Sequence, residues 1–148
     1  EKEFKNVSSG DLGLETEEEK KAAEEKNLEN KELLDFVKAA AGDDVVAVRL
    51  SGKLASQPCC LTSEGGITLE MEKYFRRGPS EEMRKIKANR VLELNPEHHA
   101  FKALKEAYET DREKAGRLSL VLLRMAEMIA GVEVEDPAAF VSLVAELF

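Results

Sequence analysis

The stretch that decides the fold is TDREKAGRLSLVLLRMAEMIAGVEVEDPAAFVSLVAELF, residues 110–148. Apolar residues recur in it at steps of three and four, which is the spacing of one face of a helix. Thr110 and Glu113 match a capping box and predict the start of a long helix there. Asp136 and Pro137 predict the start of a second helix, because aspartate caps a helix and proline suits its first position.

The connection between these two predicted helices, residues 132–135, is short, so they must run antiparallel as a hairpin. Together they carry more apolar surface than one contact between two helices can bury. Self-association about a two-fold axis would bury the surplus by stacking two hairpins into a four-helix bundle. The alternative, which stays open, is that the hairpin packs onto the chain's own sheet. The residues predicted to face a second copy are Leu118, Val121, Leu122, Met125, Ile129, Phe140, Leu143, Val144 and Leu147.

The rest of the chain predicts a small sheet flanked by helices, and so an α+β fold. Three segments rich in apolar and β-branched residues, 45–51, 56–62 and 91–94, predict three strands. Asn95 and Pro96 follow the third strand and predict the N-cap and first position of a helix. Further helices are predicted over residues 16–27, 30–41 and 98–109.

A short amphipathic helix is predicted between the second and third strands, in GGITLEMEKYFRRGP, residues 65–79. Its apolar residues fall on one face of a helix over residues 66–77. Glycines before it and a glycine and a proline after it favour a long, flexible insertion. This face is a candidate binding surface, with the open alternative that its members are ordinary core residues. The members are Ile67, Met71, Tyr74 and Phe75.

The composition argues against several functions. The net charge is −8, and no stripe of lysine and arginine is interleaved with aromatic residues, so we expect no nucleic acid partner. The longest apolar run, 118–123, is far shorter than the about 20 residues that span a membrane. Neither a Gly-rich phosphate loop nor a Gly-x-Ser-x-Gly motif occurs, so we expect no catalytic or cofactor site. The pairs Cys59–Cys60 and His98–His99 lack the spacing of a metal site.

Cys59 and Cys60 are the only cysteines. Neighbours on a strand point to opposite faces, so a disulfide between them would be strained, and reduced thiols are expected. A redox sensor that uses this pair stays open as an alternative. The chain begins with Glu1, and no apolar core of a signal peptide follows. We therefore expect a piece of a longer protein that is soluble and cytoplasmic.

Several segments, in the same order, resemble the C-terminal domain of the heat-shock protein 90 chaperones, closest to the bacterial HtpG type. They are Glu93-Leu94-Asn95-Pro96-Glu97-His98, VRLSGKLASQPCCLT (residues 48–62) and EDPAAFVSLVAELF (residues 135–148). The opening KEFKNVSSGDLGL is similar to the end of that family's middle domain. The resemblance thus implies a middle-domain remnant and linker over residues 1–15 and a C-terminal dimerisation domain over residues 16–148.

The resemblance also implies a function: the constitutive homodimerisation module of an ATP-dependent molecular chaperone. Helices over residues 111–130 and 137–148 would form the four-helix bundle. The helix over residues 66–77 would project between protomers and bind unfolded or partly folded client proteins. The expected partners are a second copy, client proteins and the upstream middle domain. ATP and Mg²⁺ would bind in the N-terminal domain of the full-length parent, so this chain is not expected to be an enzyme or to hold a cofactor.

A different class of function also fits the residues. The chain could be a generic adaptor or scaffold whose exposed helix docks one dedicated partner protein, with dimerisation incidental. A single tight partner would favour the adaptor, whereas many weakly bound unfolded proteins would favour the chaperone.

Overall fold

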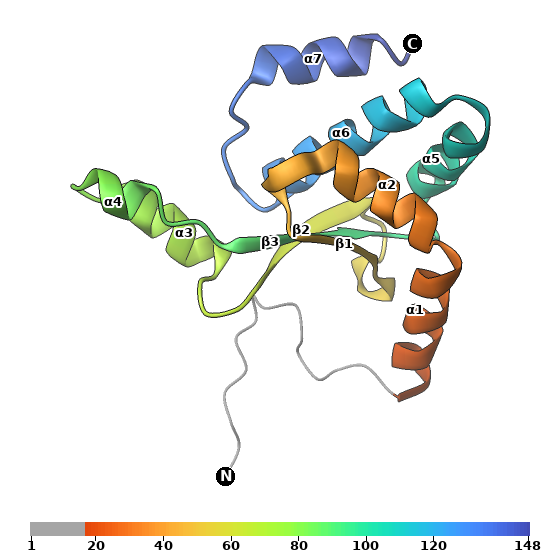
Figure 1. Cartoon of the computed structure of the whole chain (residues 1–148), viewed down its shortest axis with the longest axis horizontal. Coiled ribbons are helices and arrows are strands. Elements are labelled where there is room, and N and C mark those ends of the chain that lie inside the picture. The colour runs from red at the N-terminus through yellow and green to blue at the C-terminus, as the bar shows by residue number, and fades with distance from the viewer. Residues whose placement is uncertain (1–16) are drawn as a thin grey trace.

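The computed structural model describes residues 17–148, and the predictions for residues 1–16 lie outside this part (Figure 1). The described part is an α+β fold, as predicted. Its helices, 3₁₀ turns and strands are α1 Glu17–Glu29, α2 Lys31–Ala41, η2 Gly42–Asp44, β1 Ala47–Leu50, η3 Gly52–Leu54, β2 Cys59–Glu64, α3 Leu69–Arg76, α4 Glu81–Arg84, β3 Asn89–Leu94, α5 His99–Thr110, α6 Arg112–Ile129 and α7 Pro137–Ala145.

The predicted three-stranded sheet is confirmed, with β3 in the centre. β1 pairs with β3 in parallel and β2 pairs with it antiparallel, so Leu94 lies between Leu50 and Cys59. β2 begins three residues later than predicted, because residues 56–58 belong to the turn and bend that follow η3. Ala55, at the start of this turn, has a φ of 51°, outside the strand region.

The core lies between one face of the sheet and the helices above it (Figure 1). α2 packs on β1 and α6 packs on β2, while α2 and α5 also pack against α6. Full burial of one leucine or valine side chain stabilises the fold by about 1.5 to 3 kcal/mol. Large side chains without exposed surface include Val37, Leu92, Leu94, Leu104 and Leu123.

α1 stands at the edge of this core and is solvated, as its polar sequence predicts, with no buried residue. Asn27 and Lys26 tie it to the rest of the domain. The side-chain oxygen of Asn27 accepts a hydrogen bond from the backbone N–H of Leu50 at 2.8 Å. Lys26 forms an ion pair with Glu97 at 2.7 Å.

The helix predicted over residues 98–109 is present as α5, but its predicted N-cap, Asn95, is wrong by three residues. The N-cap is His98, whose Nδ1 accepts from the backbone N–H of Ala100 at 3.0 Å. The Asn95 side chain is engaged elsewhere: it donates to two carbonyl groups of the turn before β2 and accepts from the Glu97 N–H. The Asn95 side chain therefore links the end of β3 to the turn before β2. Because it makes these hydrogen bonds, Asn95 does not cap α5.

The predicted cap of α6 is wrong by one residue, while the predicted cap of α7 is confirmed. Asp111, not Thr110, caps α6 by accepting from the N–H of Lys114 at 3.2 Å. The Thr110 hydroxyl instead donates to the Glu106 carbonyl in the last turn of α5. Asp136 caps α7 by accepting a backbone hydrogen bond at 3.0 Å.

The predicted antiparallel hairpin is present, and α7 lies along α6 on the side away from the sheet (Figure 1). Arg117, near the start of α6, is ion-paired with Glu146, just after α7, at 2.8 Å. No residue of α7 is buried, and none belongs to the core cluster. The hairpin therefore uses α6 for the core and places α7 outside it.

The two cysteines of β2 are both reduced, and the surroundings of both suppress the thiolate form. Cys59 is buried and its thiol donates to the Leu122 carbonyl at 3.2 Å. Burial raises the pKa of Cys59 to about 11. Burial and the negative charge of Glu93 raise the pKa of Cys60 to about 12. Because the thiolate is the reactive form, these positions argue against a redox sensor.

We expect Leu104→Ala to lower the free energy of unfolding by about 2 to 5 kcal/mol, because it leaves a cavity at a fully buried site. The matched control is Leu28→Ala in α1, whose side chain is 73% exposed and whose loss should change stability by less than about 0.5 kcal/mol. Urea unfolding followed by circular dichroism measures both. Equal losses in the two variants would contradict the assigned core.

We expect both thiols of the folded chain to react with Ellman's reagent at pH 7 about a hundredfold more slowly than free cysteine, because their raised pKa values leave little thiolate. The rate should keep rising with pH beyond the range in which free cysteine levels off. The same chain in urea is the control and should react at the rate of free cysteine. A fast phase in the reaction of the folded chain with Ellman's reagent would favour a redox sensor that uses these cysteines.

Candidate functional site

α3 and α4 project together from the end of the sheet (Figure 1). The predicted helix over residues 66–77 is present, but it begins at Leu69 because Thr68 is its N-cap. The Thr68 hydroxyl accepts from the backbone N–H of Met71 at 3.1 Å. The short helix α4, which the sequence did not predict, follows and packs against α3. Ser80 caps it by accepting from the N–H of Met83.

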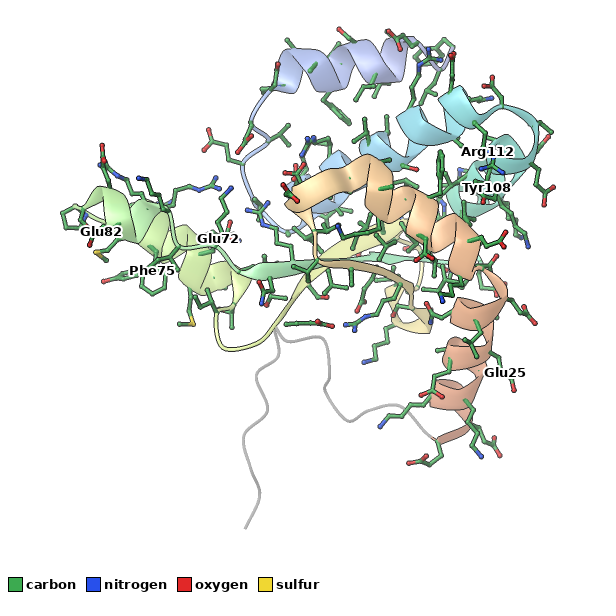
Figure 2. The ribbon with its side chains drawn as sticks, viewed as in Figure 1. Glu25, Glu72, Phe75, Glu82, Tyr108 and Arg112 are labelled. Atoms are coloured by element: carbon green, nitrogen blue, oxygen red, sulfur yellow. The ribbon has the colours of Figure 1, made fainter. Side chains whose placement is uncertain are left out.

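The four residues predicted to form the exposed face of this helix do not share one environment. Tyr74 is 72% exposed and Met71 is 40% exposed. Phe75 is half-buried, with its ring 5.9 Å from that of Tyr74 in an edge-on arrangement, and it lies on the projecting part of the molecule (Figure 2). Ile67 precedes the helix and packs against the core. The exposed apolar surface, here called the α3 face, therefore consists of Met71, Tyr74 and Phe75.

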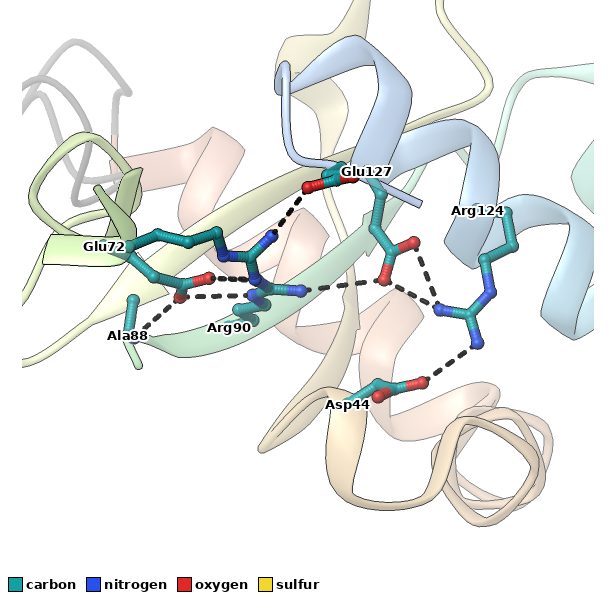
Figure 3. Close-up of polar contacts among 8 residues, drawn as sticks. Asp44, Glu72, Ala88, Arg90, Arg124 and Glu127 are labelled. Atoms are coloured by element: carbon teal, nitrogen blue, oxygen red, sulfur yellow. Dashed lines mark hydrogen bonds and ion pairs between the residues drawn. The ribbon is translucent and has the colours of Figure 1, made fainter. Parts of the chain in front are cut away.

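The opposite side of α3 is anchored by a buried acid. Glu72 is only 3% exposed, and its carboxylate accepts from the backbone N–H of Ala88 at 2.8 Å. It is also ion-paired with Arg90 at the start of β3 (Figure 3). Leu69, one turn earlier on the same side, is buried as well. The side of α3 that carries these two residues therefore faces the domain.

The ion pair of Glu72 continues across the molecule to α6 (Figure 3). Arg90 lies 3.6 Å from Glu127, a residue of α6 that is 3% exposed. Arg124, one turn earlier on α6, pairs with Glu127 at 2.9 Å and with Asp44 of η2 at 3.2 Å. These five residues are called the ion-pair chain below. Because its charges alternate in sign, each buried acid meets at least one arginine.

The two buried acids of the ion-pair chain differ in pKa. Burial tends to raise the pKa of Glu72, but hydrogen bonds from Arg90 and Ala88 and the charge of Arg90 outweigh burial and hold it below its ordinary value. Burial dominates at Glu127 and raises its pKa in spite of Arg124 and Arg90. Burial lowers the pKa of Arg124, but its two acidic partners outweigh burial and raise it. Glu72 is therefore held as an anion, which suits its anchoring role.

The residues predicted to face a second copy divide between two sides of α6. Leu122 is 4% exposed and lies in the chain's own core, and Val121 is 8% exposed. We therefore leave Leu122 out of the proposed interface, since its burial is complete within one chain. Leu118 and Met125 are partly buried against the core, whereas Ile129 is 45% exposed.

The predicted residues on and just after α7 share one environment, because all of them are half-buried between α6 and solvent. They are Phe140, Leu143, Val144 and Leu147. Three further apolar residues of the hairpin, which the prediction missed, are more exposed: Met128 at 49%, Val141 at 63% and Phe148 at 103%. Periodicity alone could have found Val141 and Phe148, because both lie beside the apolar face of this helix.

No metal-ion site was found in residues 17–148. No three His, Cys, Asp or Glu side chains of this part are grouped to hold a metal ion. The rings of His98 and His99 are stacked at 4.2 Å, and His98 is used as a cap. A hollow of ≈ 530 Å³ lies between α1, the η3 turn and the residues after β3, and neither histidine nor cysteine lines it. None of the helices in this part is long and apolar enough to cross a membrane.

The chain was compared with known proteins. It is 45% identical over 146 residues to the "Chaperone protein HtpG" of Alkaliphilus oremlandii, which covers 99% of this chain. It is 42% identical over 140 residues to the protein of the same name from Bacillus subtilis, and 42% identical over 147 residues to that of Clostridium perfringens. The chain spans only 23%, 22% and 23% of the length of these three relatives.

A family model described as "Hsp90 protein" matches residues 1–148, which is the whole chain. The chain belongs to the Hsp90 protein family.

Proposed function

We propose that the chain is the homodimerisation module of a molecular chaperone and that its α3 face contributes to binding unfolded client proteins. The observation that carries the first part is the composition of α7. Its sequence, PAAFVSLVA, has no charged residue, yet none of its nine residues is buried within the chain. A helix that is apolar on nearly all sides is normally buried, so a second surface must cover it.

A second copy of the same hairpin fits this requirement. Four exposed apolar residues belong to the hairpin: Met128 and Ile129 at the end of α6, Val141 on α7 and Phe148 after α7. Stacking this surface on its own copy about a two-fold axis would give a four-helix bundle. The relatives are chaperones about four times as long as this chain. Permanent pairing here would raise the effective concentration of the two remaining parts of such a protein for one another.

The α3 face supports the second part of the proposal. Met71 and Tyr74 are exposed on a helix that projects from the sheet, where a partner can reach them. Methionine is flexible and polarisable, so it adapts to many apolar surfaces, and tyrosine adds a large apolar ring with a polar end. Such a face suits weak binding to varied unfolded segments. ATP and Mg²⁺, which the family's reaction needs, would bind in a part of the parent protein outside this chain.

We expect Val141→Asp to raise the dissociation constant of the dimer by at least about a hundredfold, because it would place an unpaired charge in an apolar interface. The side chain is 63% exposed in the single chain, so the fold itself should remain. Leu28→Asp in α1, at a site 73% exposed and outside the hairpin, is the matched control. Light scattering across a dilution series gives the mass. A wild-type chain that is monomeric at micromolar concentration would refute the proposed dimer.

We expect the double variant Met71→Ser, Tyr74→Ser to bind a reduced, carboxymethylated lysozyme about tenfold more weakly, because it removes the exposed apolar contacts of the α3 face. The dimer should be unchanged. Leu28→Ser in α1, also an exposed apolar residue, is the control and should bind normally. Fluorescence anisotropy of the labelled lysozyme measures the affinity. Unchanged binding by the double variant would remove the client role, and tight binding of one folded protein alone would favour the adaptor.

A further inference from the structure

α3 touches the connection between α6 and α7 as well as the sheet. The Lys73 ammonium group donates to the carbonyl of Ala130, the C-cap of α6, at 2.6 Å. It also lies over Gly131, where an added Cβ would come within 3.1 Å of the Lys73 nitrogen. One turn further along α3, Arg76 lies 3.8 Å from Glu133. Two basic residues of α3 therefore hold the first residues after α6.

The buried side of α3 reaches the same region by another route. Glu72 pairs with Arg90, and Arg90 pairs in turn with Glu127. The backbone carbonyl of Glu127 accepts from the N–H of Val132, a buried residue of the connection. Three residues of α3 are therefore connected, directly or through Arg90, to one short segment, residues 127–133. They are Glu72, Lys73 and Arg76, here called the α3 clasp. The α3 face lies on the same two turns of helix as these residues.

The position of α7 depends on that segment. α7 has no buried residue, so no core contact fixes it. Its far end is held to α6 by the ion pair between Arg117 and Glu146. Its near end follows the connection that the α3 clasp holds, and in Figure 1 this connection leaves α6 at the end nearest α3. A displacement of α3 would therefore act on the segment that leads into the near end of α7.

We propose that the α3 clasp sets the position of α7, so that occupancy of the α3 face and self-association of the chain alter one another's affinity. This inference rests on the proposed function, which supplies the two binding events. This coupling is reciprocal by thermodynamic necessity. If a bound client segment changes the dissociation constant of the dimer by some factor, dimerisation changes the dissociation constant of the client segment by the same factor. Glu72, Lys73 and Arg76 are positioning residues in this scheme, since they act through α7 and touch neither the client nor the second chain.

The first test is the double variant Lys73→Met, Arg76→Met, which removes both charges and keeps the aliphatic stems. Glu72 loses Arg76 at 3.6 Å but keeps its ion pair with Arg90 and its hydrogen bond from Ala88, so the buried anchor and the fold are expected to remain. The matched control is Arg77→Met, Lys85→Met, which changes the net charge equally at two exposed residues that have no ion pair within the described part of the chain. Hydrogen exchange of residues 137–148, at concentrations where both variants are dimeric, reports on α7.

We expect exchange in α7 to be about three to ten times faster in the clasp variant, together with a dimer dissociation constant raised by a similar factor. The control variant should match the wild type in both measurements. Unchanged exchange in the clasp variant would overturn the positioning role of the α3 clasp.

The second test measures the dimer dissociation constant with and without saturating reduced, carboxymethylated lysozyme. We expect at least a threefold change in the wild type and in the control variant, and none in the clasp variant. A constant that stays the same in the wild type, although the lysozyme binds, would overturn the coupling and leave the proposed function intact. A chain that is monomeric throughout would overturn both.

Discussion

The packing of α6 against the sheet is the contact on which the rest of the molecule depends. The inner side of α6, with Leu122, Leu123 and Ala126, is buried between β2 and the neighbouring helices. This burial uses only part of an apolar arc that is wider than a single helix contact needs. The outer part of the arc is covered by α7, which adds no side chain to the core. One long helix thus supports the domain on one side and offers an apolar hairpin on the other.

Periodicity and composition were enough to predict most elements and the hairpin, because hydrophobic spacing reports directly which residues leave water. They could not predict which apolar residues of α6 face the sheet and which face outward. Hydrophobic spacing gives the width of an apolar face but not the partner of each part of it. Leu122 was therefore assigned to a partner although it belongs to the core. The caps at His98 and Asp111 were missed because Asn95 and Thr110 make other hydrogen bonds, which only the folded chain reveals.

The burial of Glu72, which anchors α3, could not be predicted from the sequence either. A glutamate among charged neighbours on a helix is ordinarily solvated, and acids are almost never fully buried unless paired. Glu72 is paired by Arg90, which lies 18 residues further along the chain. Burying an ion pair contributes little net stability, because desolvation offsets most of the attraction. Its geometric effect is larger: the carboxylate fixes which side of α3 faces the sheet and so leaves Met71 and Tyr74 outward.

The uncharged sequence of α7 has a consequence for the choice of partner. Protein pairs that must reject close relatives commonly do so with like charges placed to repel the wrong chain. Between its first and last residues α7 offers no such charge, and the nearby Glu146 is already paired within its own chain. An interface built on this helix can discriminate only by shape. In the proposed dimer, a related chain whose α7 has the same shape would therefore pair with this chain as readily as a second copy does.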